Sequence, residues 1–318
     1  MSGNGYLTAA FYLFVELPDC AALQAPLLAR CEALQIKGLI LLAHEGINGT
    51  VAGAPENIAA LLEFLRADPR LQALEHKESW SDKPPFRRMR VRVKREIVTL
   101  GVPGINPAKQ AGIYVKPQHW NALISRPDVV VVDTRNTYEV ELGTFQGAKN
   151  PQIASFAELP NWVNDAPSMQ PENGKRPVVA MFCTGGIRCE KSTALLRQQG
   201  FTEVYHLQGG ILKYLEVVPP EDSLWQGECF VFDERVSVGH GLQAGPHQLC
   251  RCCRQPLPEG ALNAPEFELG VSCPRCYGTT SSAQKDGARE RQRQWVRAKV
   301  RAQTHSARLP DQEGPEES

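Results

Sequence analysis

The first hundred residues show two hydrophobic periods that predict alternating strands and helices. Residues 7–16 and 36–43 are mostly apolar over the length of a strand, whereas 19–34 and 55–65 carry leucine and isoleucine at the spacing of a helix face. A glycine-containing turn at 45–49 leads into a third strand. A final strand is predicted at 88–94. The order strand, helix, strand, strand, helix, strand predicts a ferredoxin-like α/β sandwich, a fold that serves many functions.

The final strand alternates strictly between basic and apolar residues. Its odd positions are Met89, Val91 and Val93, which we expect to face the core. Its even positions are Arg88, Arg90, Arg92 and Lys94. Residues 83–95 together hold seven basic residues and no acidic one. We therefore predict that this face binds RNA phosphates, the alternative being a solvated edge strand guarded by its charges.

A second region, after a Pro/Gly-rich connector at 101–107, is organised around an apolar run that ends at a cysteine. Residues 178–182 are all apolar, Cys183 follows them, and two glycines lead into an amphipathic pattern. This succession predicts a buried strand, a tight loop and a helix whose first turn lies over the loop. The polar, proline-bearing stretch 160–177 predicts a surface loop.

The loop after this strand is suited to hold a sulfur anion. Backbone N–H groups and the positive end of the helix converge on Cys183, and both lower a thiol pKa. The loop backbone consists of Thr184, Gly185, Gly186 and Ile187. Its glycines let the chain curl around the sulfur, and Arg188 adds a positive charge. The pattern predicts a cradle for a thiolate or persulfide, with Cys189 either a resolving thiol or a buried packing residue.

Three other interpretations compete for the same residues. A phosphate-binding P-loop would need a glycine directly before Lys191, where Glu190 stands instead. A phosphatase loop would place five residues between cysteine and arginine, whereas four separate Cys183 from Arg188. A plain core cysteine at a strand end is the third interpretation, because free cysteine is commonly buried. The adjacent glycines and arginine favour a reactive cysteine.

Composition limits this organisation further. At 318 residues the chain is long enough for two or three domains, and its 35 basic and 35 acidic residues balance, so an RNA surface has to come from local clustering. Ten cysteines are too few for a disulfide scaffold, and no signal peptide or membrane-spanning run is evident. We expect a cytoplasmic protein without membrane contact, divided into 1–100, 101–112, 113–220, 221–280 and 281–318.

The last hundred residues contain two cysteine pairs and a basic helix. Nineteen residues separate the pair Cys250 and Cys253 from the pair Cys273 and Cys276, which is the spacing of a zinc ribbon, although Cys252 could replace Cys253 as a ligand. The alternative is a dithiol relay that resolves a persulfide. Residues 285–301 predict a basic helix with Trp295 and Val296 as its apolar contacts, followed by a disordered tail.

The cysteine loop and its flanks resemble rhodanese domains, which carry sulfur as a cysteine persulfide. The resemblance rests on the apolar strand and acidic turn at 129–139, the segment 143–150, the loop 183–189 and the glycine turn at 206–211. It implies a central α/β domain with a parallel sheet. Together these motifs cover roughly residues 113–218.

The whole chain resembles the rhodanese-domain tRNA uridine hydroxylases. The additional matching segments are 45–50, 101–107, 239–241 and 271–276. The resemblance implies oxygen-dependent 5-hydroxylation of the wobble uridine in tRNA, with Cys183 as the essential cysteine. No flavin or nicotinamide fingerprint and no iron-ligand set is visible, so the electron donor is not identified by the sequence. Two alternatives are a rhodanese-type sulfurtransferase acting on tRNA or a small acceptor, and a non-catalytic RNA-binding adaptor.

Overall fold

The fold is described from a computed structural model that covers residues 5–233, 235–257 and 260–306. Two compact units make up the chain, one ending at Pro246 and the other beginning at His247, and each is described by itself. The expected disordered tail, residues 307–318, lies outside the described residues. Among the residues described, no helix is both long enough and apolar enough to cross a membrane.

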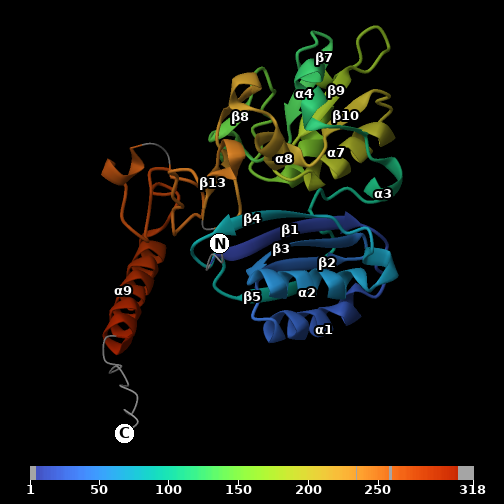
Figure 1. Cartoon of the computed structure of the whole chain (residues 1–318). Helices are drawn as coiled ribbons and strands as arrows, with labels where there is room; N and C mark the ends of the chain where they lie inside the picture. Colours follow the sequence, from blue (N-terminus) through green and yellow to red (C-terminus); the bar gives the residue numbers. More distant parts are fainter. Residues whose placement is uncertain (1–4, 234, 258–259, 307–318) are drawn as a thin grey trace. The chain divides into compact units, whose positions relative to one another are not determined.

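The N-terminal part of the first unit is a five-stranded sheet with two helices on one face (Figure 1). Along the sheet the strands follow the order β4-β1-β3-β2-β5. The strands are β1 (Tyr6–Phe14), β2 (Lys37–Ala43), β3 (Gly46–Gly53), β4 (His76–Ser81) and β5 (Met89–Val93). The helices are α1 (Cys20–Ala33), α2 (Pro55–Arg66) and the short η1 (Pro69–Leu71). Phe11, Ile40 and Leu61 belong to the core beneath this sheet, which confirms the predicted α/β sandwich.

The basic strand does not take the place that its sequence suggested. β4 closes the ferredoxin-like order, and β5 is an additional edge strand that runs parallel to β2. Val91 is buried in the core at 5 % exposure, but Val93 at the end of the strand is 37 % exposed. The expectation that Val93 faces the core is therefore wrong. An edge strand has a neighbour on one side only, so alternation alone does not bury its last residue.

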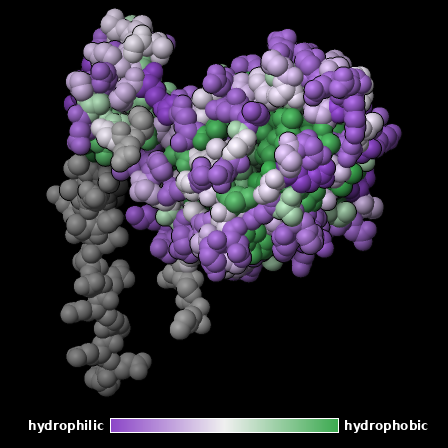
Figure 2. All heavy atoms as spheres, turned by 90° about the horizontal axis from the view of Figure 1, so that it is seen from above, coloured by the Kyte–Doolittle hydropathy of each residue, from purple (hydrophilic) through white to green (hydrophobic). Residues whose placement is uncertain are grey.

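The central part of the first unit is a parallel sheet in the order β6-β10-β9-β7, as the sequence predicted. The strands are β6 (Ile113–Val115), β7 (Val129–Asp133), β9 (Val178–Phe182) and β10 (Val204–Leu207). The helices are α3 (Pro107–Gln110), α4 (Pro117–Ile124), α5 (Thr137–Val140), α7 (Ile187–Gln198) and α8 (Gly210–Val217). All five residues of β9 are buried, as expected for a strand inside a parallel sheet. In the space-filling view, hydrophobic residues gather in the middle of this unit with hydrophilic ones around them (Figure 2).

The stretch predicted as a surface loop is partly helical, so that prediction is wrong. It contains all but the first residue of α6 (Leu159–Asp165) and the 3-10 turn η3 (Pro167–Met169), and it follows η2 (Phe156–Glu158). Val163 and Met169 are buried in the core. Pro160 and Pro167 stand in the first turns of their helical segments, where a missing N–H leaves no hydrogen bond broken.

Residues that follow the central sheet pack back onto it. β11 (Trp225–Gly227) pairs with β8 (Gly143–Phe145), and the Trp225 and Phe145 rings lie 5.1 Å apart. The remaining elements of the unit are η4 (Pro220–Asp222), β12 (Cys229–Phe230), β13 (Ser237–Val238) and η5 (His240–Leu242). Trp225 and Val238 belong to the same core as Tyr214 of α8.

A buried ion cluster ties the N-terminal sheet to the central part of this unit. The Lys191 ammonium on α7 is 1 % exposed and donates to both carboxylate oxygens of Glu45, each at 2.8 Å. It also donates to the Glu96 carboxylate and, at 3.0 Å, to the Val98 carbonyl. The turn before β3, the segment after β5 and helix α7 therefore meet at one lysine, although they are far apart in sequence.

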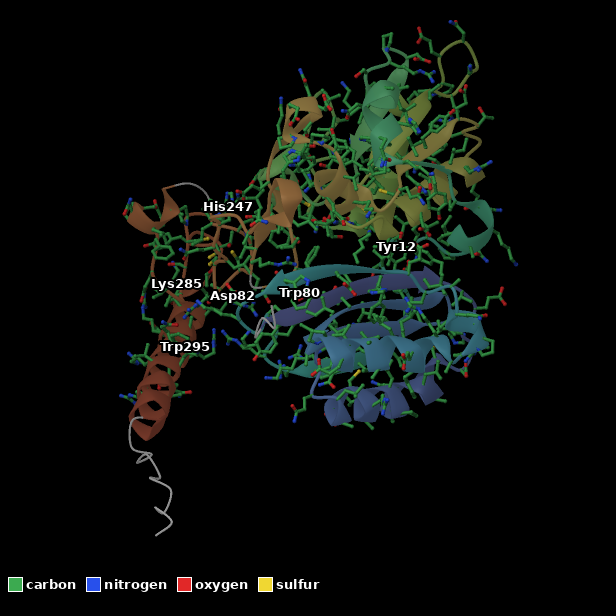
Figure 3. The ribbon with its side chains drawn as sticks, in the orientation of Figure 1. Tyr12, Trp80, Asp82, His247, Lys285 and Trp295 are labelled. Atoms are coloured by element: carbon green, nitrogen blue, oxygen red, sulfur yellow. The ribbon has the colours of Figure 1, made fainter. Side chains whose placement is uncertain are left out.

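The second unit has a small core made largely of cysteine. Cys250, Cys273 and Cys276 are buried with Leu257 and Ala261, the latter in η6 (Ala261–Asn263). The predicted basic helix is present as α9 (Ser282–Ser306). Its side chains contact the cysteine segment, because Arg289 pairs with Glu268 at 2.6 Å and the Trp295 ring, labelled in Figure 3, lies under the Arg251 guanidinium at 4.3 Å.

Candidate active site

Cys183 lies at the carboxyl end of β9, directly before α7, where parallel sheets commonly bind ligands. Its sulfur is fully buried and accepts a hydrogen bond from the Gly186 N–H at 3.1 Å. Gly186 has a φ of +107°, a conformation that side-chain-bearing residues rarely adopt. A Cβ at this position would also lie 2.7 Å from the Tyr12 hydroxyl. The loop thus needs glycine here for both reasons.

The first turn of α8 holds the loop from the other side. The Ile211 N–H donates to the Cys183 carbonyl at 2.9 Å, and the Leu212 N–H donates to the Thr184 carbonyl at 3.1 Å. A Cβ on Gly210 would lie 2.6 Å from both carbonyl oxygens. The outward carbonyls are therefore paired, which leaves the loop N–H groups to serve the sulfur.

The surroundings of the sulfur favour its anion. Burial by itself raises the pKa of the Cys183 thiol, but the hydrogen bond from Cys189, the Arg188 charge and the N–H groups of Cys189 and Gly186 outweigh it. The net effect is a pKa well below the usual value for a cysteine. These contacts favour the thiolate over the thiol, and the thiolate is the form in which cysteine reacts.

Arg188 is engaged in a buried ion pair rather than being a free charge. Its guanidinium forms two hydrogen bonds with the Glu139 carboxylate, both at 2.7 Å, and a third with the Thr184 hydroxyl at 3.2 Å. Burial raises the pKa of Glu139, but the Arg188 charge and its hydrogen bonds lower the pKa by a larger amount. The net pKa lies below the usual value for a glutamate, which favours the ionised carboxylate. The arginine consequently links the Thr184 hydroxyl of the loop to Glu139, in addition to contributing a positive charge.

Cys189 lies next to Cys183, and its pKa is shifted in the opposite direction. Its thiol is fully buried, with the sulfur 3.7 Å from the Thr134 hydroxyl oxygen. Burial first, and then the neighbouring Cys183, raise the pKa of Cys189 above its ordinary value. The Cys189 thiol can donate a hydrogen bond to the Cys183 sulfur and so favours the anion there.

Two residues of the site, Tyr12 and Lys77, were missed by the sequence prediction. Tyr12, labelled in Figure 3, extends from β1 and donates to the Glu190 carboxylate at 2.7 Å. Lys77 extends from β4 and donates to the carbonyls of Gly185 and Gly209, at 2.5 and 2.7 Å. Both partners are more than a hundred residues away in sequence, so no local motif could indicate these contacts.

The predicted RNA-binding residues stand apart from this loop. Arg88, Arg92 and Lys94 are exposed and Arg90 is partly buried, all on or beside β5. β5 and β4 are the two edges of the N-terminal sheet. The structure therefore does not bring these four basic residues to the Cys183 sulfur.

The four predicted metal ligands do come together in the second unit. The sulfurs of Cys250, Cys253, Cys273 and Cys276 all lie within 4.8 Å of one another, an arrangement that could hold a metal ion. Cys252 is not a member of this group. Four clustered thiols of this kind offer soft ligands suited to a thiophilic metal.

These features define a class of protein in which a rhodanese-like domain with a cysteine loop follows a separate α/β sandwich. Two family models match accordingly: the "UPF0176 acylphosphatase like domain" over residues 6–97 and the "Rhodanese-like domain" over 116–216.

Comparison over the full chain narrows this class to one family. The chain is 67% identical over 306 residues to the tRNA uridine(34) hydroxylase of Albidiferax ferrireducens, covering 96% of each protein. It is 58% identical to the protein of that name from Acaryochloris marina, covering 94% of this chain and 96% of the relative. For the protein of that name from Teredinibacter turnerae the identity is 56%, with 95% and 93% covered. The chain belongs to the tRNA uridine(34) hydroxylase family.

Proposed function

We propose that this protein hydroxylates uridine 34 of tRNA at C5, using O₂ and an external electron donor. The observation that carries the proposal is the buried Cys183 sulfur that accepts the Gly186 N–H, in a chain 67% identical to a tRNA uridine(34) hydroxylase over nearly its whole length. Cys183 is the catalytic residue of this proposal, as thiolate or persulfide. Arg188 and the loop from Thr184 to Ile187 hold it, and Cys189 serves as the resolving thiol.

The register of the N-terminal sheet supports RNA binding by the basic strand. Lys77, Ala10, Thr50, Leu39 and Arg90 are successive partners in one row across the five strands. Paired residues point to the same side of a sheet, so the arginine shares the face of Lys77, which contacts the Cys183 loop.

The next row of the sheet repeats this pattern. It joins Tyr12, Asn48, Leu41 and Arg92. Four strand spacings of about 4.8 Å separate the edges, so the basic strand is about 19 Å from β4. This distance suits an RNA whose backbone binds β5 while one nucleotide reaches the cysteine loop. We therefore assign Arg88, Arg90, Arg92 and Lys94 to phosphate binding.

The proposal is tested by measuring 5-hydroxyuridine in tRNA nucleosides from cells that lack the protein. Wild-type protein should restore the nucleoside, and Cys183→Ser should not, because a serine hydroxyl is not an anion near neutral pH and carries no sulfane sulfur. Cys31→Ser is the matched control, since Cys31 is equally buried but lies in the N-terminal core. Normal 5-hydroxyuridine with Cys183→Ser would contradict the proposal.

A sulfurtransferase is the second candidate, favoured by the match of residues 116–216 to the rhodanese-like domain. The same measurement separates the two functions, because a sulfurtransferase predicts loss of a thiolated nucleoside and unchanged 5-hydroxyuridine. An adaptor without catalysis predicts that neither nucleoside changes.

We further propose that the four-cysteine group binds structural zinc. The sulfur–sulfur distances are 3.9 Å for Cys250 and Cys276, 3.8 Å for Cys253 and Cys273, and 3.7 Å for Cys273 and Cys276. A tetrahedron with zinc–sulfur bonds of about 2.3 Å has edges of about 3.8 Å. The residues thus fit the metal.

The division of the chain into 1–100, 113–220 and 221–280 stays a prediction. The packing of Trp225 and Val238 in the same core as Tyr214 favours extending the central part towards Pro246. In this proposal the first part binds RNA and the central part carries Cys183.

A further inference from the structure

Lys77 makes contacts that suggest a role beyond joining two parts of the chain. Its ammonium reaches from β4 to two carbonyl oxygens, those of Gly185 and Gly209. Both carbonyls belong to the turns around the Cys183 sulfur: the cysteine loop itself and the glycine turn that opens α8. The lysine is only partly exposed, so its charge is directed at these turns rather than at solvent.

One of these carbonyls belongs to the peptide group that serves the sulfur. The Gly185 carbonyl and the Gly186 N–H are the two ends of a single planar peptide, and in a trans peptide they point in opposite directions. Lys77 binds the oxygen end, and the nitrogen end donates to the Cys183 sulfur at 3.1 Å. A cation on the carbonyl also polarises the peptide and strengthens its N–H as a donor.

This peptide would be easy to rotate without such a partner. It connects two glycines, which tolerate both orientations of the peptide because they lack a Cβ. Rotation by half a turn would point the carbonyl oxygen at the sulfur and disfavour the thiolate. The Tyr12 hydroxyl occupies the space beside Gly186, so the N-terminal sheet restrains both residues of the peptide.

We propose that Lys77 is a positioning residue for Cys183: it fixes the Gly185–Gly186 peptide with its N–H towards the sulfur, so that the N-terminal sheet completes the active site. The inference rests on the proposed function, since it gives that function's cysteine a partner in another domain. In this proposal the loop around Cys183 depends on the preceding N-terminal sheet, because Lys77 comes from that sheet.

The charges around Lys77 agree with this position. Burial lowers the pKa of Lys77 to about 8, and the anions Cys183 and Glu190 counteract the burial. Lys213 on α8 lowers the pKa and Glu75, just before β4, raises it. Lys77 is therefore a cation at neutral pH that faces the cysteine loop, α7 and α8.

The test is the pH dependence of Cys183 alkylation by iodoacetamide, followed by mass spectrometry of the peptide that contains it. In Lys77→Met the midpoint of the profile should move up by about one pH unit, because the N–H to the sulfur is weakened or lost. Lys77→Arg should restore much of the wild-type midpoint, since its guanidinium can still bind a carbonyl. A change in packing alone would alter the rate but not the midpoint.

Lys213→Met is the matched control, because Lys213 is a neighbouring lysine whose ammonium pairs with Glu216 and does not bind the loop. It should keep the wild-type midpoint. If Lys77→Met does not fold, Lys77→Gln removes the same charge with a shorter polar chain and should give the same upward movement. An unchanged midpoint in a folded Lys77→Met or Lys77→Gln protein would overturn the inference.

The two proposals fail in distinguishable ways. Cys183→Ser protein that still forms 5-hydroxyuridine would reject the proposed function, whereas the alkylation profile of Lys77→Met would still report on the peptide. An unchanged profile together with an inactive Cys183→Ser would reject only the role of Lys77.

Discussion

Two groups of cysteines in this chain are held in opposite ways. Around Cys183 a large apolar core supplies the fold, and backbone N–H groups, Cys189 and a buried ion pair stabilise one sulfur. In the second unit the core consists mainly of cysteines, with Leu257 and Ala261 as its buried aliphatic members. In the first region an apolar core holds the loop that positions the Cys183 sulfur, and in the second the cysteine side chains themselves form most of the core.

This difference separates reactive from structural cysteine. A sulfur that is itself the core cannot change its bonds without unfolding its surroundings. Cys183 can change its bonding because strand β9 and helix α7 are held by residues such as Met181 and Leu196. Among the described residues the four-cysteine group has a much smaller apolar core, so in our proposal a bound metal stabilises it.

The largest expected effect is the unfolding of the second unit when its metal is lost, with no change at Cys183. Structural zinc in small cysteine sites contributes about 10–16 kcal/mol of apparent binding free energy, which is then folding free energy. Chelation, or Cys273→Ser, should make residues after 246 sensitive to protease, and Cys183 alkylation should not change. Metal analysis of the purified protein should give about one equivalent. Metal-free protein with a disulfide among these cysteines would instead support the dithiol relay.

The next effect tests how the first region holds its sulfur. Arg188→Ala should lower the free energy of unfolding by about 3–5 kcal/mol, because it leaves the buried Glu139 carboxylate without its partner. Denaturant unfolding measures this change. The double variant Arg188→Met with Glu139→Gln removes both charges and should recover much of the loss. Equal destabilisation of both proteins would mean that the charges do not act as a pair.

A smaller effect concerns tRNA affinity. Replacing Arg88, Arg90 and Arg92 with Gln should reduce the slope of log affinity against log salt by about two to three, since each phosphate contact contributes about 0.7–0.9. Fold stability should stay close to wild type because Val91 and the core face are unchanged. Arg126→Gln, with an exposed arginine on the central part, is the control. A wild-type slope for the triple variant would show that the strand is merely solvated.

The smallest effect distinguishes the two cysteines of the first region. Cys189→Ser keeps a hydroxyl that can donate to the Cys183 sulfur, so the alkylation midpoint of Cys183 should move by less than about one pH unit. Oxidation should no longer link positions 183 and 189, as mass spectrometry can detect. Full multiple-turnover activity would make Cys189 a hydrogen-bond donor only and contradict its role as resolving thiol.

Local features of the sequence predicted most of the fold. The periods of the apolar residues located β1, β2, β9 and the helices α1, α2 and α7 within a few residues, because each period depends only on neighbours along the chain. The prediction of a turn at 45–49 is wrong for most of its residues, because β3 begins at Gly46. The prolines at 160 and 167 misled this reasoning. Proline disrupts a helix only in its interior, and both stand in first turns.

The site was predicted only as far as its local motif reaches. The loop around Cys183 is contiguous in sequence, so its glycines and Arg188 indicated an anion cradle. The partners that complete it are not contiguous: Glu139, Lys77 and Tyr12 come from three other elements. β5 shows the same limit, because its alternation predicted a strand but not which strand it would pair with.

The Lys191 cluster determines how modular this protein can be. Its ammonium is buried where the N-terminal sheet meets the central part, and both of its carboxylate partners, Glu45 and Glu96, come from outside the central part. Removing the partner of a buried charge costs about 3–5 kcal/mol, a large share of the 5–15 kcal/mol that keeps a typical domain folded. We therefore expect the rhodanese-like part to lose stability when it is separated from the N-terminal sheet, and the two parts to unfold together.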